Sequence, residues 1–397
     1  MNATSQAGNG PAADAGAGTV RLFLCGDVMT GRGVDQVLPH PVAPHLFEAW
    51  ARTAVAYVEL AERVSGPIGR GLGFDYPWGD ALTVLQDFAP SARIVNLETA
   101  VTTSEDAAPG KGIHYRMNPA NVACLTGAGI DCCVLANNHV LDWGRKGLLQ
   151  TLACLQDAGL RTAGAGRNAQ EAAAPAEIAL GPTGRVLVFA CAAEDSGVPA
   201  GWAATRHQAG VNFVDRVSAR TAAPIAELVN RQRRPGDIVV VSVHWGGNWG
   251  FDVSREQRAF AHRLIDDGGA DVVHGHSSHH VKGLEVYRGK LILYGCGDFL
   301  NDYEGIGGQE RFRADLRLMY FPLLDAASGD LRELRAVPMR MRRLRLERAD
   351  GDGTSWLRET LAREGAAFGT RFATDAQGTL SLCWPASSEA LPAAAAH

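Results

Sequence analysis

Four of the twelve histidines in this 397-residue chain lie within one short stretch, DVVHGHSSHHVKG, which spans Asp271 to Gly283. Imidazoles gathered near carboxylates and amide oxygens are typical of a divalent metal site. His274 and His276 continue an apolar run, and alternate side chains of an extended segment face the same way, so we expect them to share a ligand. The roles of His279 and His280 are not determined by the sequence. Each one supports the metal site, faces a substrate or lies on the surface. The tract also matches sequences that bind metal adventitiously.

Polar side chains also end the other apolar runs of the chain. In chain order they are Asp27, Asn96, Glu98, Asn137, Asn138, His139, Asp142, His244, His274, His276 and Asp298. The carboxyl ends of strands line the ligand crevice of an open α/β sheet, so these residues are expected to meet there. Each one alone has a structural explanation, because an asparagine makes turns and a buried histidine satisfies a core hydrogen bond. Their recurrence at six strand ends indicates a site for Zn, Mn, Fe or Ca.

The elements that must position these residues are apolar runs that alternate with amphipathic segments. Continuous β-branched runs are typical of strands buried on both faces. Together the runs and segments predict a layered α/β fold. Helices that end near a glycine are predicted at 146–159, 220–236 and 254–269. Strands are predicted at 19–27, 92–98, 129–139, 185–192, 237–246, 270–276 and 290–299.

The remaining segments are organised around one main domain. Residues 1–18 are predicted to be a disordered tail, and residues 19–345 to be the catalytic domain. Within that domain, residues 33–78 are predicted to be an irregular or helical insertion. Residues 346–397 are predicted to be a C-terminal extension with a short helix and a strand.

Two later segments, 313–325 and 331–348, alternate between apolar and polar residues and are predicted to be antiparallel strands at a sheet edge. The basic run MRMRRLRLERAD, Met339–Asp350, falls largely within the second segment. Its alternation indicates a strand with one charged face rather than a nucleic-acid-binding surface.

Composition argues against several classes of protein. The net charge of −5 at pH 7 gives no basic excess, so nucleic acid is not an expected partner. The eight cysteines form no CxxC pair and lie mostly in apolar runs, which suits core residues in a reducing compartment. The first residues show no signal-peptide pattern and no apolar run is long enough for a membrane span, so we expect a cytoplasmic protein.

Five motifs, taken in order, resemble those of a known family. They are GDVM at Gly26–Met29, NLE at Asn96–Glu98, NNH at Asn137–His139, HWG at His244–Gly246 and HGHSSHH at His274–His280. The series is similar to that of the CapA/PgsA family, which is named for poly-γ-glutamate capsule synthesis, and it covers roughly residues 20–345. That family is similar in turn to the calcineurin-like metallophosphoesterases. The resemblance therefore implies a layered sandwich of two mixed sheets flanked by helices.

Carried over position by position, the calcineurin-like pattern implies His139 as the catalytic histidine. Two positions depart from the pattern, because Met29 replaces a histidine and Glu98 replaces an aspartate. A thioether is a poor ligand for a hard or borderline ion, so one of the two metal positions is weakened. We expect one or two divalent ions and no organic cofactor. The implied metal ligands are Asp27, Glu98, Asn138, His244, His274 and His276.

Three functions compete. The leading interpretation is a metal-dependent acid/base enzyme acting on a peptide, because the chain resembles the lasso-peptide epimerase of this family, which inverts the C-terminal residue of a ribosomal precursor peptide. The alternative is an enzyme or accessory role in poly-γ-glutamate or polyglutamine synthesis. The third function is a metallophosphoesterase, which the Asn138–His139 pair favours and Met29 opposes.

Epimerisation needs two acid/base groups on opposite faces of a Cα atom. His139 with Asp142 forms one candidate pair, and the second comes from Asp27, Asp298 and the stretch His276–His280. The candidate catalytic residues are therefore His139, Asp142, Asp27, His276, His280 and Asp298.

Four residues are candidates for contact with a peptide or polyglutamate-type substrate. The guanidinium fork of Arg32 suits a carboxylate or phosphate, although a structural acid would suit it equally. Trp245 and Trp249, in HWGGNWGF, would hold an apolar peptide end or would simply pack their loop. His279 extends the crevice toward the substrate. Nothing in the sequence determines the oligomeric state.

Overall fold

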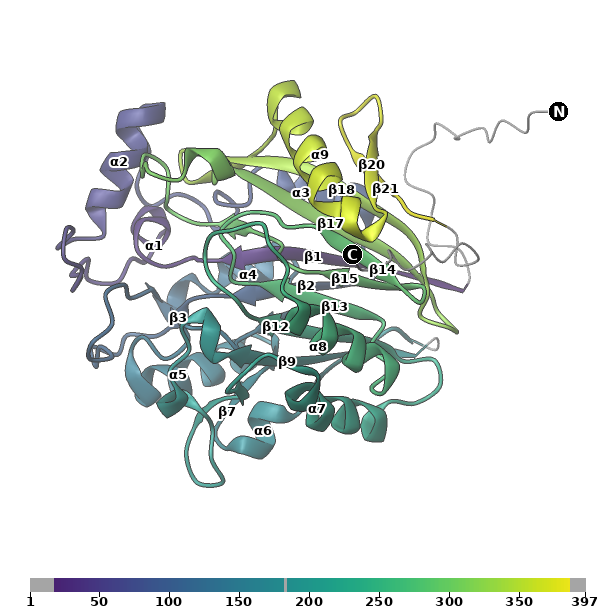
Figure 1. The fold of residues 1–397 in the computed structure, drawn as a ribbon. Helices are drawn as coiled ribbons and strands as arrows, with labels where there is room; N and C mark the ends of the chain where they lie inside the picture. The colour runs from purple at the N-terminus through teal and green to yellow at the C-terminus, as the bar shows by residue number, and fades with distance from the viewer. Residues whose placement is uncertain (1–17, 182–183, 386–397) are drawn as a thin grey trace, which may run out of the picture.

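A computed structural model describes residues 18–181 and 184–385 of the chain. Two mixed β-sheets stack face to face, and helices cover their outer faces (Figure 1). This is the layered α/β sandwich that the sequence predicts. The predicted tail lies outside the described residues except for Gly18.

The first sheet is built around β1, Thr19–Val28. Parallel strands continue the sheet on one side of β1 and antiparallel strands on the other side, where the short parallel strand β16 (Asp298–Leu300) also pairs with the carboxyl end of β1. The other parallel strands are β2 (Ala92–Leu97), β5 (Cys132–Val134) and β6 (Arg161–Ala163). The antiparallel strands are β17 (Leu316–Asp325), β18 (Leu331–Arg342), β19 (Arg345–Arg348), β21 (Leu380–Cys383) and β20 (Arg371–Thr374).

The second sheet is parallel through its centre and has an antiparallel strand at two places on its periphery. Its strands, in spatial order, are β11 (Phe213–Val214), β9 (Arg185–Ala193), β12 (Ile238–His244), β13 (Val272–His276), β15 (Lys290–Leu293) and β14 (Leu284–Tyr287), with β8 (Ala176–Ala179) paired to β9. Two short pairs complete the strands: β3 (Ala100–Val101) with β4 (Arg116–Met117), and β7 (Ala165–Gly166) with β10 (Gly210–Val211).

The continuous apolar strands of the second sheet are buried on both faces, as their composition requires. In β9, Val186 and Val188 belong to the core between the sheets, whereas Leu187 and Phe189 belong to a second core beneath the helices. That second core is closed by α7 (Ala219–Gln232) and α8 (Arg255–Asp266), each of which begins with a serine capping box.

The other helices lie beside the first sheet or within the insertion, except for α6, which packs against β7 and β10. Helix α5 packs against β3 and β6. The insertion at residues 33–78 contains α1 and α2, and α2 projects from one end of the molecule (Figure 1). Their bounds are α1 (Gly33–Val37), α2 (Val55–Ser65), α3 (Ala81–Phe88), α4 (Ala123–Gly127), α5 (Gly144–Asp157), α6 (Ala169–Ala173) and α9 (Gly351–Gly365).

Several predicted elements differ from the observed ones. The strand predicted at 129–139 ends at Val134, so the NNH motif follows it in irregular backbone. The strand predicted at 290–299 is two strands, β15 and β16, which belong to different sheets because the backbone turns at Gly297, where φ is 78°. The predicted edge strand β18 is covered by β21, and the basic run turns back at Arg343.

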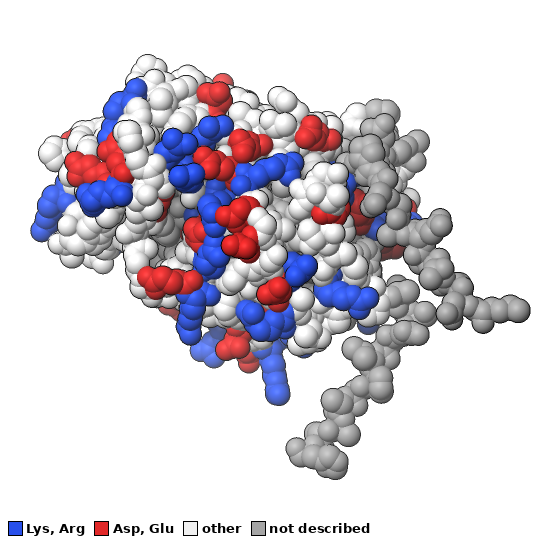
Figure 2. Space-filling view, turned by 90° about the horizontal axis from the view of Figure 1, so that it is seen from above, with Lys and Arg blue, Asp and Glu red and all other residues white. Residues whose placement is uncertain are grey.

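Charged side chains of both signs are interspersed in a band across the face seen from above (Figure 2). This face therefore presents no extended surface of a single sign, and nucleic-acid binding stays unsupported. In the part of the chain that the structure describes, no helix combines the length and hydropathy that crossing a bilayer requires.

Candidate metal centre

The carboxyl ends of β1 and β2 and the first residue of β16 bring the first donors together, so Asp298 begins a strand instead of ending one as the sequence predicts. Asp27 of β1 is in register with Asp298 of β16 on one side and with Asn96 of β2 on the other. In the second sheet, His244 of β12 is in register with His276 of β13. The two sheets meet at these ends, because His274 Nε2 lies 2.7 Å from the carbonyl oxygen of Cys25 in β1. The predicted crevice is therefore a junction of two sheets rather than the end of one.

Two groups of donor atoms form at this junction, and Asp27 belongs to both. In the first group, Asp27, His244 and His276 offer ligand atoms that all lie within 4.8 Å of one another. The second group joins Asp27 to His279 and Asp298 within the same limit. All five residues are buried. The groups differ from the ligand set implied by the resemblance, which contains His274 in place of His279 and Asp298.

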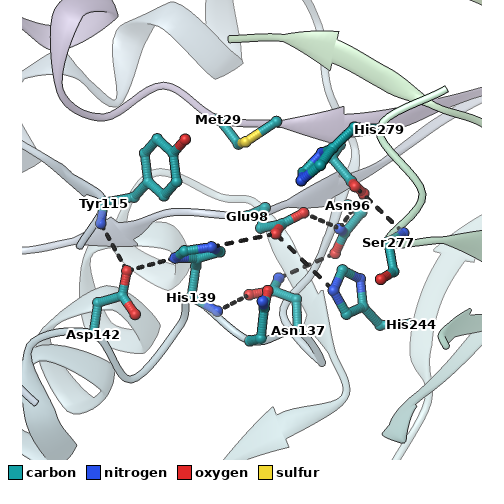
Figure 3. A network of polar contacts seen from close by, with 12 residues as sticks. Met29, Asn96, Glu98, Tyr115, Asn137, His139, Asp142, His244, Ser277 and His279 are labelled. Atoms are coloured by element: carbon teal, nitrogen blue, oxygen red, sulfur yellow. Dashed lines mark hydrogen bonds and ion pairs between the residues drawn. The ribbon is translucent and has the colours of Figure 1, made fainter. Parts of the chain in front are cut away.

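Glu98 connects these groups to the NNH segment (Figure 3). Its Oε1 atom lies 3.6 Å from His139 Nε2 and 4.0 Å from His244 Nε2. The Asn96 amide donates to Asp27 Oδ1 at 2.7 Å and to Glu98 Oε2 at 3.4 Å. Asn137 in turn donates to Asn96 Oδ1 at 3.0 Å. A chain of amides thus fixes the orientation of the two carboxylates.

His279 reaches the junction because the chain turns sharply after β13. Ser277 takes up a φ of 101°, which is rare for a residue with a side chain, and its N–H donates to Asp27 Oδ2 at 3.3 Å. His279 Nδ1 then lies 2.8 Å from Asp298 Oδ1. Burial alone would lower the pKa of His279, but Asp298 and Asp27 together raise it above its usual value.

Negative charge is crowded at the junction. Burial, followed by the charge of Asp298, raises the pKa of Asp27 to about 7. Burial and the charge of Asp27 raise the pKa of Glu98 well above its usual value. Burial lowers the pKa values of His244 and His276 well below normal, so both imidazoles are neutral at pH 7 and have nitrogen lone pairs to offer. A divalent cation is the group that such carboxylates and neutral imidazoles bind.

The unpaired side-chain oxygen of Asn138 also suits a bound divalent cation. Asn138 Oδ1 is shielded from solvent and makes no hydrogen bond within the residues that the structure describes. Its sequence neighbours are Asn137, which is bonded to Asn96, and His139, which faces Glu98. A buried amide oxygen without a partner is costly, and coordination of a cation would satisfy it. The residues present therefore fit a divalent metal ion.

His139 is held from behind by a carboxylate. Its Nδ1 atom lies 2.7 Å from Asp142 Oδ2, which also accepts a hydrogen bond from the N–H of Tyr115 at 2.7 Å. Lys111 forms an ion pair with Asp142 and a hydrogen bond with the carbonyl oxygen of Asn138. Burial lowers the pKa of His139 to about 4, although Asp142 opposes this shift. Asp142 thus orients His139, whereas the sequence predicts the two as an acid/base pair. Lys111 follows no motif and was not anticipated.

Two predicted histidines are occupied elsewhere. Both ring nitrogens of His274 are engaged, because Nδ1 lies 3.0 Å from Ser242 Oγ while Nε2 contacts the Cys25 carbonyl. His280 Nε2 accepts from the N–H of Gly250 at 3.1 Å, and its Nδ1 lies 2.9 Å from the Val281 carbonyl. The structure places His274 as a tie between the sheets and His280 in the packing of its loop.

Among the predicted substrate contacts, Trp245 and Arg32 are also engaged by the protein. Trp245 is buried, and its Nε1 donates to the carbonyl oxygen of Tyr294 at 2.9 Å. The Arg32 guanidinium donates to Asp302 from two nitrogens and to Glu48 from the third. Trp249, His279 and Arg32 line a cleft of about 690 Å³ beside the junction, whereas Trp245 does not.

Met29 and two tyrosines complete the surroundings, of which Met29 and Tyr115 are seen in Figure 3. The Tyr303 hydroxyl lies 3.7 Å from the Met29 sulfur and 3.0 Å from the Tyr115 hydroxyl. The Tyr115 ring also packs edge-on against His139, with 4.6 Å between ring centroids. Sequence reasoning missed both tyrosines, since neither stands at the end of an apolar run.

Comparison with known proteins agrees with the motif resemblance. Residues 21–303 match the family model described as "Bacterial capsule synthesis protein PGA_cap". A probable polyglutamine synthesis accessory protein of Mycobacterium tuberculosis is 48% identical over 364 residues, which cover 91% of this chain and 96% of that protein. The capsule biosynthesis protein CapA of Bacillus anthracis is 28% identical over 71% of this chain and 59% of its own length. The PGA biosynthesis protein CapA of Bacillus subtilis is 29% identical, over 70% and 62% respectively.

Proposed function

The chain belongs to the PGA_cap family of bacterial capsule synthesis proteins, and from that membership we propose that it is a metal-dependent enzyme acting on an amide-linked chain of glutamate or glutamine. The names of its relatives support the kind of polymer, since one is named for polyglutamine synthesis and another for PGA biosynthesis. These names favour the polymer alternative over the lasso-peptide epimerase.

The observation that carries the enzymatic part of the proposal is the cluster of donors at the joined strand ends. Asp27 belongs to two buried groups of metal-ligating atoms, and Glu98 lies beside them with a strongly raised pKa. Buried carboxylates destabilise a fold unless a cation or hydrogen-bond donors compensate them. A bound cation would offset this cost, and an enzyme would use the same cation in catalysis.

We assign one or two divalent ions to two adjoining positions, and Asp27 is a ligand at both. A divalent ion bound there would act as a Lewis acid and polarise an amide carbonyl oxygen. The residues that would hold it are Asp27, Glu98, Asn138, His244 and His276 on one side, and Asp27, His279 and Asp298 on the other.

His139 is the residue proposed to move the proton. With Nδ1–H donating to Asp142, its Nε2 faces Glu98 with a free lone pair. A pKa of about 4 keeps the imidazole neutral at pH 7, so it acts as an acceptor. Once it has taken a proton, Asp142 stabilises the imidazolium, which can then protonate the leaving amine.

Polymer turnover tests this proposal. The protein is incubated with γ-linked polyglutamate and with polyglutamine, with and without a chelator, while chain length and new amino groups are followed. We expect cleavage or rearrangement of the amide chain that requires the ion and is lost in His139→Ala but retained in the control His280→Ala. A polymer that stays unchanged with every ion tested contradicts the enzymatic proposal.

Epimerisation at a peptide Cα is the second candidate, and one observation favours it. Two separate histidine–carboxylate pairs face the junction: His139 with Asp142 at 2.7 Å, and His279 with Asp298 at 2.8 Å. Inversion of a Cα centre uses two such acid/base groups.

Reaction in heavy water separates the two candidates. The substrates are the polymer and a lasso precursor peptide. Deuterium uptake at a Cα atom of either substrate without any new amino group would establish epimerisation. New amino groups without deuterium at Cα would establish amide-bond chemistry. A generic phosphoester serves as a third substrate, and its rapid turnover would point to the metallophosphoesterase instead.

A further inference from the structure

A pair of hydrogen-bonded tyrosines connects the two histidine–carboxylate pairs of the junction. The Tyr115 hydroxyl donates to the Tyr303 hydroxyl at 3.0 Å. The Tyr115 ring packs edge-on against His139, with 4.6 Å between ring centroids. The Tyr303 ring packs edge-on against His279, with 5.4 Å between centroids. Each tyrosine therefore lies beside one of the two histidines that contact a carboxylate.

The Tyr303 hydroxyl has a good donor but only a poor acceptor. Tyr115 fills one of its lone pairs, whereas its own hydrogen is directed to the Met29 sulfur at 3.7 Å. A thioether is a weak acceptor, and a phenol keeps its proton at neutral pH. Within the part of the chain that the structure describes, no oxygen or nitrogen accepts this hydrogen. It is therefore available to an oxygen atom of a ligand.

Tyr303 is held in place from two sides. Its N–H donates to Asn301 Oδ1 at 3.3 Å, and Asn301 donates in turn to Asp298 Oδ2 at 2.7 Å. The central carbon of the Arg32 guanidinium lies 5.7 Å from the centre of the Tyr303 ring. A donor fixed in this way needs no rearrangement when a ligand binds.

Tyr303 also lies where the cleft meets the metal centre. Both Tyr303 and His279 line the 690 Å³ cleft, and His279 belongs to the second group of metal-ligating atoms. Met29, which the hydroxyl faces, follows Asp27 by two positions and is seen near Glu98 in Figure 3. A ligand that enters from the cleft and reaches the metal-ligating groups therefore passes the Tyr303 hydroxyl.

The charges around Tyr303 favour a neutral oxygen atom as its partner. Buried carboxylates already crowd negative charge at the junction. Arg32, which lies beside Tyr303, is paired with Asp302 and Glu48. A dianion such as phosphate would therefore gain no charge-assisted bond from this arginine. A carbonyl oxygen needs only the hydrogen bond that the hydroxyl offers.

We propose that the Tyr303 hydroxyl donates a hydrogen bond to the carbonyl oxygen of the amide group that reacts at the metal centre. This inference rests on the proposed function and adds a substrate-contacting residue to it. The hydrogen bond strengthens as the carbonyl oxygen gains negative charge, so it favours the transition state over the bound substrate. Tyr115 keeps the hydroxyl oriented, because its own hydroxyl donates to that of Tyr303.

Tyr303→Phe tests the proposal, because it removes the hydroxyl and keeps the ring. The probe is acetohydroxamate, a small carbonyl compound that carries negative charge when it chelates a metal ion. Titrated into the zinc-loaded protein in a calorimeter, it should bind about tenfold more weakly to the variant than to the wild type. The zinc content of the variant should equal that of the wild type, because the phenol is not a ligand.

Three results would overturn the proposal. Equal affinities would show that the hydroxyl does not contact the probe, and so would a zinc-loaded wild-type protein that binds no acetohydroxamate. A loss of zinc in parallel with the loss of acetohydroxamate would show that Tyr303 only supports the fold of the site.

Two further variants isolate the hydrogen bond. The control Tyr287→Phe removes a hydroxyl whose bond with Asp266 is exposed, so acetohydroxamate binding should not change. Met29→Leu removes the weak acceptor with little change of volume, so the probe should bind at least as tightly as to the wild type. A Met29→Leu variant that loses as much affinity as Tyr303→Phe would attribute the effect to packing and overturn the proposal.

Polymer turnover separates this inference from the proposed function. In Tyr303→Phe, kcat should fall at least about tenfold while KM changes less than about threefold. Turnover at the wild-type rate would keep the enzyme and reject the role of Tyr303. Weakened acetohydroxamate binding without turnover of any polymer would keep the role of Tyr303 as a carbonyl donor and reject the polymer as substrate. A wild-type protein that takes up no zinc would reject both.

Discussion

At the residue scale, Asp27 is the group on which both sets of donors depend. Its carboxylate contacts the Asn96 amide and the Ser277 N–H, and it stands in register with Asp298. These neighbours fix its direction, while burial and the charge of Asp298 raise its pKa to about 7. Protonation of Asp27 and metal binding at its oxygens therefore compete.

That competition predicts a pH dependence. Below about pH 7 Asp27 carries a proton that the ion must displace, so metal affinity should rise as the pH rises through 7 and level off above it. Calorimetric titration with Zn or Mn between about pH 5.5 and 8.5 measures the affinity. An affinity that is constant or falls over this range would mean that Asp27 is not a ligand.

Replacement of His279 distinguishes the structural assignment from the sequence-based one. His279→Ala should lower metal affinity by at least about tenfold, because it removes a donor of the second group. The matched control is His280→Ala, whose ring nitrogens contact only backbone groups and which should bind metal normally. Equal affinity in the two variants would exclude His279 from the site.

Sequence reasoning identified the residues at strand ends but not every role. Asp27, His244 and His276 could be anticipated because strand direction alone delivers them to the junction. His279 was predicted to contact substrate, and it lines the cleft. Its position beside Asp298 could not be predicted, because nothing local announces the positive φ at Ser277 that turns its ring. His274 was predicted to be a ligand from its HxH spacing with His276 and from the resemblance. Its contact with the Cys25 carbonyl could not be predicted, because Cys25 lies 249 residues away in the chain.

At the element scale, the site depends on how closely two strands approach. A Cβ atom on Gly26 would lie 1.6 Å from the carbonyl oxygen of Gly297, so β1 and the entry to β16 touch through bare backbone. This contact keeps Asp27 beside Asp298. Close packing against Gly297 therefore explains why the GDVM motif begins with a glycine.

Gly26→Ala should therefore push the two strands apart. We expect a loss of at least about 3 kcal/mol in the free energy of unfolding, measured in urea, together with lower metal uptake. As a control, Gly127→Ala places its methyl group in open space in α4 and should be neutral or slightly stabilising. A Gly26 variant as stable as this control would refute the close approach.

Element boundaries were predictable only where composition changes. The parallel strands β1, β2, β9 and β12 were found because apolar runs stop at polar residues. The run at 290–299 stays apolar through Gly295 and Gly297, so its division between two sheets left no compositional signal. That division is what brings Asp298 next to Asp27.

At the scale of the whole molecule, Arg32 joins the insertion to the rest of the fold. Its guanidinium pairs with Glu48 of the insertion at 3.0 Å and with Asp302, after β16, at 2.5 Å. All three side chains are buried. The two segments that it joins also form walls of the cleft.

Arg32→Met should accordingly act on stability. Removing the cation leaves two buried carboxylates unpaired, at a cost of about 3–5 kcal/mol in the free energy of unfolding. The control Arg70→Met removes an exposed pair with Glu62 and should cost less than about 1 kcal/mol. If Arg32 instead bound the substrate, its variant would unfold like the control and lose only polymer binding.

The two-sheet architecture could be predicted because alternating runs and helices leave few ways to bury both faces of each strand. The cleft could not be predicted, since its walls come from the insertion, the segment after β16 and the end of β18. Trp50 and Arg342 belong to no motif, and only the folded chain places them around one cavity.

The joined ends of the two sheets are the proposed site of a divalent ion, on which the proposed function most directly depends. Elemental analysis of untagged protein, dialysed against Zn, Mn, Fe and Ca in turn and then against buffer, tests that proposal. We expect at least one tightly held ion per chain in the wild-type protein, and less than about a tenth of that in Asp27→Asn. A wild-type protein that retains no ion under any of these conditions would contradict it.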